Sequence, residues 1–139
     1  MGKIEFDGFA ETLLSFEEIA ELPTSVLDQM LDAEAQIVMR QQASVARSYG
    51  LVDTGQMVNS ITCTSPKDTA DGGRTCNVYP QGSRTRGKTT TRNASIAFYN
   101  EYGVKGRPGK PWMETANAQC EDEARAAAEE VFNSYIGSK

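Results

Sequence analysis

Hydrophobic residues recur at intervals of three and four over residues 24–49, and this spacing predicts a long amphipathic helix. Ser25 and Asp28 have the spacing of a capping box, and Gly50 follows where a helix C-cap belongs. At 1.5 Å per residue such a helix is roughly 37 Å long. We therefore expect it to form the spine of the core. Its apolar positions are Leu27, Met30, Leu31, Ile37, Val38 and Val45.

The same period returns over residues 111–136 and predicts a second long helix. Pro111 suits the first turn, because the backbone N–H that proline lacks would have no partner within the helix there. Gly137 follows as a terminator. Trp112, the single tryptophan, comes directly after a Gly- and Pro-rich elbow. We expect it to pack in the core as a large, rigid anchor.

Between the helices, polar and apolar residues alternate, which predicts an antiparallel meander over residues 57–102. The predicted strands are residues 61–64, 74–80 and 94–102. In the third strand, Phe98 and Tyr102 are expected on one face, with Tyr99 and Glu101 on the other. Residues 81–93 are polar throughout and are interpreted as a long loop.

The first 23 residues are expected to form an N-terminal arm. Ile4 and Phe6 alternate with polar residues as in a short edge strand, and residues 13–19 suggest a short amphipathic turn or helix that ends before Pro23. The order of helices, meander and helix predicts an α+β fold with a small antiparallel sheet of three to four strands packed by two long α-helices. A length of 139 residues fits a single domain.

Composition narrows the classes of function. A formal net charge of −5 argues against a general nucleic-acid-binding protein, which usually has a basic footprint. No apolar run approaches the ~18 residues needed to cross a bilayer, and residues 1–16 lack the apolar region of a signal peptide. We therefore expect a soluble protein made in a cytosol, with no membrane partner.

Histidine is absent, so the commonest general base and metal ligand is missing. The carboxylates at 121–123 and 129–130 would fan around a helix instead of converging, so they are interpreted as a solvated face. The three cysteines, Cys63, Cys76 and Cys120, form no C-x-x-C pair and indicate neither a disulfide scaffold nor a zinc site. Cys63 and Cys76 are interpreted as small core residues. We expect no catalytic set, no metal and no cofactor, and hence no enzyme.

One segment departs from the acidic character of the chain. Within residues 81–93 there are four positive charges and no acids, at Arg84, Arg86, Lys88 and Arg92. Two interpretations remain open. The segment is either a flexible, solvated connection, or it contacts phosphates or an acidic neighbour and becomes ordered on assembly. No aromatic residue stands between the charges, so base stacking is not suggested.

Three segments, taken in order, resemble signatures of one protein family. They are "DTGQMVNSI" at residues 53–61, "IAFYNEYG" at 96–103 and "RPGKPWMETA" at 107–116. Their order, spacing and flanking long helices are similar to those of the tail-component proteins of tailed bacteriophages, which include neck and tail-completion proteins. The resemblance covers roughly residues 16–136. The chain departs from the family pattern at Val104, Trp112 and Thr115.

This resemblance implies a structural virion protein at the neck or proximal tail, assembled in the host cytoplasm. It implies a ring, hexameric when assembled, which contacts head–tail connector and tail-terminator or tail-tube proteins while DNA passes through the lumen without base recognition. The motif residues with an implied structural or interface role are Gly55, Met57, Ser60, Ile61, Tyr99, Glu101, Tyr102, Gly103, Pro111, Trp112 and Met113.

Two alternatives stay open beside this interpretation. A tail terminator or another minor tail protein would have nearly the same sequence features. A protein of another class, a small intracellular module that binds nucleic acid or peptides, would use the basic segment at residues 84–92 as its site.

Overall fold

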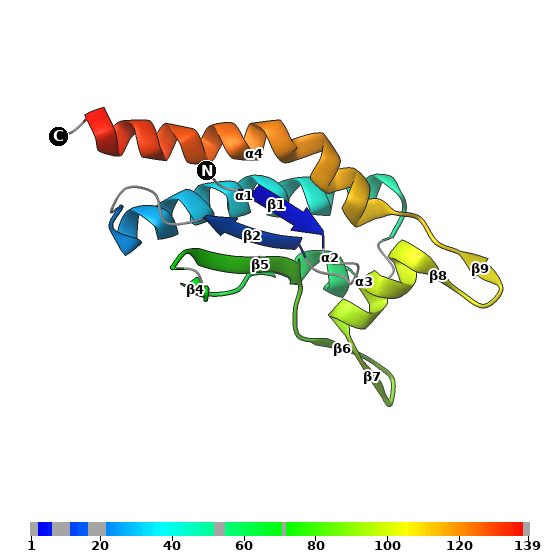
Figure 1. The fold of residues 1–139 in the computed structure, drawn as a ribbon. Helices are drawn as coiled ribbons and strands as arrows, with labels where there is room; N and C mark the ends of the chain where they lie inside the picture. The colour runs from blue at the N-terminus through cyan, green and yellow to red at the C-terminus, as the bar shows by residue number, and fades with distance from the viewer. Residues whose placement is uncertain (1–2, 7–11, 17–21, 52–54, 71, 138–139) are drawn as a thin grey trace.

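The computed structural model describes residues 3–6, 12–16, 22–51, 55–70 and 72–137. Its two long helices, α1 (Thr24–Ser48) and α4 (Trp112–Gly137), pack against each other along their length (Figure 1). Helix α1 also packs against a small antiparallel sheet, so it contacts both α4 and the sheet. The protein therefore has the predicted α+β fold, with two long helices packed together and against the sheet.

The sheet has the strand order β1-β2-β5-β3, and every neighbouring pair is antiparallel. A two-residue strand, β4, also pairs with β5, beyond the end of β3. Leu14 and Cys76 are paired across β2 and β5, and both are buried on the side of the core. The strands are β1 (Lys3–Phe6), β2 (Thr12–Phe16), β3 (Ile61–Cys63), β4 (Lys67–Asp68) and β5 (Arg74–Pro80).

The helix predicted at residues 24–49 is confirmed as α1, but its predicted capping box is wrong. Pro23 is the N-cap and makes no side-chain cap hydrogen bond, and the Asp28 carboxylate binds Arg74 instead. The charged pair outcompetes the cap because a guanidinium offers two aligned donors to the carboxylate. Gly50 ends the helix as predicted, with a φ of 73° and its N–H donating to the Arg47 carbonyl at 3.0 Å.

At the N-terminus the edge strand is confirmed, since β1 lies at one edge of the sheet. The turn or helix predicted from residue 13 is wrong for residues 13–16, which belong to β2. Leu13 pairs with Asn77 and Leu14 with Cys76, so pairing with β5 decides the conformation of this short apolar run. Residues 17–19 of that prediction lie outside the described residues.

The third predicted strand is wrong, because residues 93–102 form helix α3 (Asn93–Tyr102). Its buried residues, Asn93, Ala97 and Glu101, are spaced by four, as on one face of a helix. Aromatic composition favoured a strand, but β5 already pairs with β2 on one side and with β3 and β4 on the other. No edge of β5 is therefore left for these residues.

The loop predicted at residues 81–93 is also wrong. It contains an antiparallel hairpin of β6 (Ser83–Arg86) and β7 (Thr89–Arg92), turned at Gly87 with a φ of 63°. The run of β-branched threonines favours this extended pairing. A second, shorter hairpin of β8 (Gly103–Val104) and β9 (Arg107–Pro108) follows α3. A short helix, α2 (Gln56–Asn59), precedes β3.

The C-terminal helix is confirmed as α4, which begins directly after Pro111. The Pro111 carbonyl accepts a hydrogen bond from the Thr115 N–H at 3.1 Å, as expected at a helix start. Three small residues of α4, Ala116, Ala124 and Ala128, are buried and allow the helix to approach its neighbours closely. None of the helices in the described part of the chain has the length and apolar character needed to span a membrane.

Candidate functional site

The described parts of the three motif segments, residues 55–61, 96–103 and 107–116, come together at the end of the molecule where α1 finishes and the two hairpins project (Figure 1). Asn100 of α3 links them. Its side-chain amide approaches Met57 Sδ of α2 at 3.6 Å, and its carbonyl accepts the Lys110 N–H at 2.7 Å. The segments that are separate in the sequence therefore form one structural junction.

The first segment fastens the sheet to the base of the larger hairpin. Gly55 begins α2 with a φ of 82°, and the apolar side chains of Met57 and Ile61 are buried. The Ser60 hydroxyl donates to the Met57 carbonyl at 2.7 Å, and the Ser60 carbonyl accepts the Gln81 N–H at 3.1 Å. These motif residues are placed to support the junction and do not form an exposed surface.

Glu101 joins α3 to the start of α4. Its carboxylate is buried and accepts a hydrogen bond from the Met113 N–H at 2.7 Å. Burial raises the pKa of Glu101, although the N–H groups of Met113 and Glu114 favour the charged form. A carboxylate is stabilised at a helix N-terminus, so Glu101 acts as an N-terminal cap of α4.

Trp112 is fully buried, with 0% of its surface exposed, which confirms the expectation that it packs in the core. Its indole Nε1–H donates to the Ala97 carbonyl at 3.3 Å. The side chain that begins α4 is thus held by α3 through both packing and a polar contact. The elbow before Trp112 fixes how α3 meets α4.

Two glycines allow the chain to cross itself at this elbow. Gly103 has a φ of 87° and lies against the backbone of Gly109. A Cβ atom at Gly109 would lie 2.5 Å from the carbonyl carbon of Tyr102 and 2.6 Å from the Glu101 oxygen. Both neighbours are backbone atoms, so the close approach requires glycine at this position.

Replacing Gly109 with Ala is therefore expected to lower the free energy of unfolding by about 1–3 kcal/mol, as overpacking does elsewhere. Urea unfolding followed by circular dichroism measures the change. Gly137→Ala is the matched control, because nothing lies within 4 Å of a Cβ built there. Equal stability of the two variants would show that the crossing tolerates a side chain.

Helix α3 connects the two hairpins directly, and the three elements together carry a cluster of positive charges. We call this cluster the hairpin surface. The four basic residues predicted from sequence are joined there by three that lie outside residues 81–93. Glu101 is the one acidic residue in residues 81–110, and its carboxylate is buried at the start of α4. The basic residues are Arg84, Arg86, Lys88, Arg92, Lys105, Arg107 and Lys110.

A pocket of about 340 Å³ opens within this surface, lined in part by Arg84, Arg107 and Asn100. Lys88, Arg92 and Lys105 are exposed. The signal for the three additional basic residues is present in the sequence as a run of seven basic residues with a single acid, Glu101, that continues to residue 110. The strand predicted at residues 94–102 separates the last three basic residues from the first four, whereas helix α3 brings the two hairpins together.

Exposed aromatic side chains accompany the charges. Tyr99 and Tyr102, on α3, expose 44% and 46% of their surface. Phe98 packs against both rings, with centroid distances of 6.2 Å to Tyr99 and 4.8 Å to Tyr102. Tyrosine and arginine are enriched where proteins bind other macromolecules. The hairpin surface therefore has the composition of a binding surface.

The outer side of α4 has the opposite character. The helix carries six acidic residues and one arginine, all of them exposed except the half-buried Glu129, and its C-terminal half extends to the end of the molecule away from the hairpins (Figure 1). Arg125 pairs with Glu121 at 2.9 Å, and Arg40 of α1 pairs with Glu123 at 2.7 Å. The acidic residues are Glu114, Glu121, Asp122, Glu123, Glu129 and Glu130.

Within the described ranges, no group of three or more His, Cys, Asp or Glu residues is placed to hold a metal ion. No protein-family model matches the chain, and neither a curated protein nor a solved structure is similar enough to count as a match. The functional assignment therefore depends on the junction, on the hairpin surface and on the acidic side of α4.

Proposed function

We propose that this chain is a structural protein of the tailed-phage virion, and that it forms a ring at the head–tail junction or proximal tail end through which DNA passes. The observation that carries this proposal is the separation of charge between the hairpin surface and the outer side of α4. The motif segments that resemble the phage family also meet directly beneath the hairpin surface, at Asn100 and Glu101.

A ring whose subunits contact each other head to tail needs two unlike surfaces on each copy. The basic hairpin surface and the acidic face of α4 meet this requirement, and their opposite charges favour one orientation over others. The exposed rings of Tyr99 and Tyr102 supply apolar area that the charges alone do not. Such contacts weaken as salt rises, because exposed charges are screened.

The β6–β7 hairpin also suits a ring lumen. Repeated once per subunit, its four basic residues would form a positive collar, which contacts phosphates without reading bases and lets DNA slide. Connector, tail-terminator or tail-tube proteins would then contact the remaining faces of the ring. A tail terminator or another minor tail protein remains the alternative within this class.

A second candidate function, an intracellular module that binds nucleic acid or peptides, is favoured by one observation. The basic hairpin projects from the molecule and leads directly into α3, the helix that carries the exposed Tyr99 and Tyr102 (Figure 1). Such a module would bind an oligonucleotide tightly as a monomer, with an affinity that falls steeply with salt. The ring protein is instead expected to bind DNA weakly when free. A titration of labelled DNA at two salt concentrations distinguishes the two functions.

The proposed function is tested by replacing all four basic residues of the β6–β7 hairpin, Arg84, Arg86, Lys88 and Arg92, with Ser. The hairpin projects from the fold, so the melting temperature should change little, whereas joined and infectious particles should fall at least tenfold. Particle yield is measured by complementing a phage that lacks the gene and counting plaques.

The matched control removes four positive charges outside both the hairpin surface and α4, at Lys3, Arg47, Lys67 and Lys139. It changes the net charge equally and should leave more particles joined than the hairpin variant does. If the hairpin variant assembles and ejects DNA normally, the hairpin is only a solvated connection, and the role proposed for it is wrong.

A further inference from the structure

The cysteines on strands β3 and β5 lie side by side although they are far apart in the sequence. Cys63 Sγ and Cys76 Sγ are 2.8 Å apart, and both thiols are free. Cys76 exposes only 1% of its surface, whereas Cys63 is half-buried. Cys63 is therefore the more exposed residue of the pair, and the Cys76 sulfur lies directly beside its sulfur.

A β-bulge next to β3 accompanies this approach. Cys63 pairs with Val78 of β5, and Lys67 pairs with Thr75 of β5. Three residues lie between Cys63 and Lys67, but only two lie between Thr75 and Val78. The extra residue makes a bulge, which increases the local twist of the strand. Thr64 secures it, since its N–H donates to the Asn77 carbonyl at 2.8 Å and its hydroxyl accepts the Asn77 N–H at 2.9 Å.

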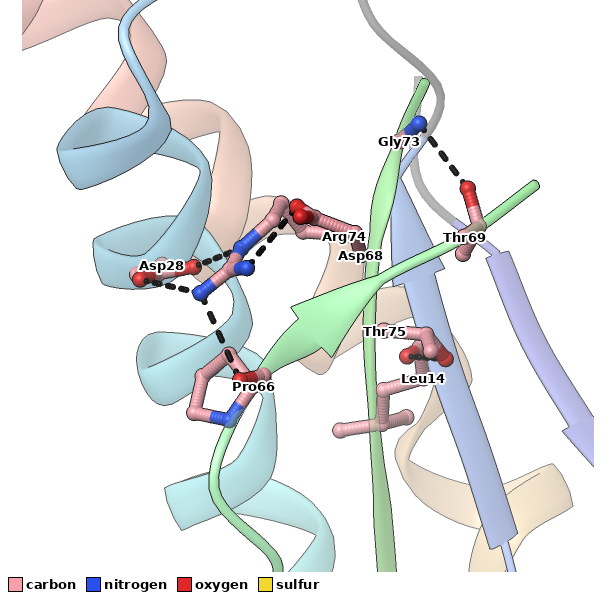
Figure 2. Close-up of polar contacts among 8 residues, drawn as sticks. All are labelled: Leu14, Asp28, Pro66, Asp68, Thr69, Gly73, Arg74 and Thr75. Atoms are coloured by element: carbon pink, nitrogen blue, oxygen red, sulfur yellow. Dashed lines mark hydrogen bonds and ion pairs between the residues drawn. The ribbon is translucent and has the colours of Figure 1, made fainter. Parts of the chain in front are cut away.

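Arg74 holds the chain at Pro66 and Asp68, just after the bulge, as Figure 2 shows. Its guanidinium donates two hydrogen bonds to the Asp28 carboxylate of α1, at 2.8 and 3.0 Å, and one to Asp68 at 3.0 Å. A further contact reaches the Pro66 carbonyl at 3.4 Å. The segment from β3 to β4 is thus fixed at both ends. The pairing of β3 with β5 holds it at Cys63, and the Arg74 contacts hold it at Pro66 and Asp68.

The two thiols differ in reactivity. The hydrogen bond between them lowers the pKa of Cys63, against the opposing effects of burial and of the Asp32 charge. The same hydrogen bond, together with burial, raises the pKa of Cys76. Cys63 is therefore the sulfur that ionises first, and it is also the more exposed one.

We propose that Cys63 and Cys76 form a reversible disulfide by thiol–disulfide exchange with a small-molecule disulfide such as oxidised glutathione. The Cys63 thiolate attacks one glutathione sulfur, the glutathione S–S bond breaks, and one glutathione leaves as its thiolate. Cys76 then loses its proton and attacks the Cys63 sulfur, which releases the second glutathione. The protein dithiol loses two electrons and two protons, and these reduce one glutathione disulfide to two thiols.

The bond would tie β3 to β5 and close residues 63–76 into a loop. In a particle assembled in a reducing cytosol and released into an oxidising medium, the pair would close after release. That timing rests on the proposed function. The chemistry of the pair does not, and it is tested on the purified chain alone.

The experiment treats the purified, reduced full chain with oxidised glutathione under denaturant-free conditions. The number of free thiols per chain, measured by titration, should fall from three to one. Peptide mapping by mass spectrometry should find Cys63 bonded to Cys76. Oxidation should raise the melting temperature by about 5–15 °C, and a dithiol reductant should reverse the rise.

Two variants test the order of the steps. Cys76→Ala should stop with glutathione attached to Cys63, because the second attacking sulfur is gone. Cys120→Ala is the matched control and should still form the bond, since Cys120 is buried on α4 and burial raises its pKa to about 11. The proposal is overturned if the wild-type chain retains three thiols, if glutathione stays attached without an internal bond, or if the bond includes Cys120.

Discussion

Replacing Trp112 with Ala is expected to lower the free energy of unfolding by about 3–5 kcal/mol. The indole is fully buried at the start of α4 and donates a hydrogen bond to the Ala97 carbonyl of α3. Its removal leaves a cavity where α3 meets α4, and the crossing at Gly103 and Gly109 limits how far the backbone can move to fill it. Because small domains are stable by only about 5–15 kcal/mol, the loss would be a large share of the total.

Urea unfolding followed by circular dichroism measures the effect of Trp112→Ala. Trp112→Phe is the control, because it retains an aromatic ring and loses only part of the volume and the N–H donor. It should be clearly more stable than the Ala variant. A change below about 1 kcal/mol for Trp112→Ala would mean that the side chain does not anchor the junction. Failure of assembly at unchanged stability would place Trp112 against a partner instead.

The second large effect is expected at Glu34, in the middle of α1. Its side chain exposes 2% of its surface, and no hydrogen-bond partner of Oε2 is found within the described residues. Burial raises the pKa of Glu34 to about 8, and the positive charge of Arg125 offsets only part of this rise. The carboxyl group is therefore largely protonated and uncharged in the folded protein at neutral pH.

A raised pKa makes the folded state bind a proton that the unfolded state has already released. Stability should therefore be greatest below the ordinary glutamate pKa of about 4.5 and should fall as pH rises towards 8. Over pH 5–8, the wild type should lose about 3 kcal/mol relative to Glu34→Gln, whose amide does not titrate. Urea unfolding of both proteins at several pH values measures this difference.

Asp32→Asn is the matched control for Glu34→Gln, because it removes a carboxylate from an exposed position of the same helix. If Asp32→Asn shows the same pH-dependent difference from the wild type as Glu34→Gln, the effect is not specific to Glu34. If the difference between the wild type and Glu34→Gln stays constant from pH 5 to 8, Glu34 does not titrate with a raised pKa. The pH profile tests the charge of the group separately from any packing change that the amide causes.

The sequence alone determined the elements whose pattern is long enough to be unambiguous. The helical period over residues 24–49 and 111–136 predicted α1 and α4, and alternation predicted β5 with its partner β3. The sequence pattern predicts these elements correctly because each of them buries one continuous face. Apolar residues therefore recur at every turn of a helix or at every second residue of a strand. The burial of Trp112 followed from the same reasoning.

Short segments were decided by their tertiary neighbours. Residues 94–102 have a composition that suits a strand, but β5 was already paired on both sides, and the packing of Ala97 and Glu101 made them a helix. Asp28 had the spacing of a cap but binds Arg74, which lies 46 residues away in the chain. In such segments the local preferences are weak, so one long-range contact changes the outcome.

The candidate site divides in the same way. Sequence alone identified Arg84, Arg86, Lys88 and Arg92 as a basic cluster, because a charge imbalance over 13 residues is visible without a fold. Only the tertiary structure added the second hairpin, brought Cys63 to Cys76, and turned Glu101 into the cap of α4. These groups come from different elements, and their meeting depends on backbone crossings and strand register that no local pattern encodes.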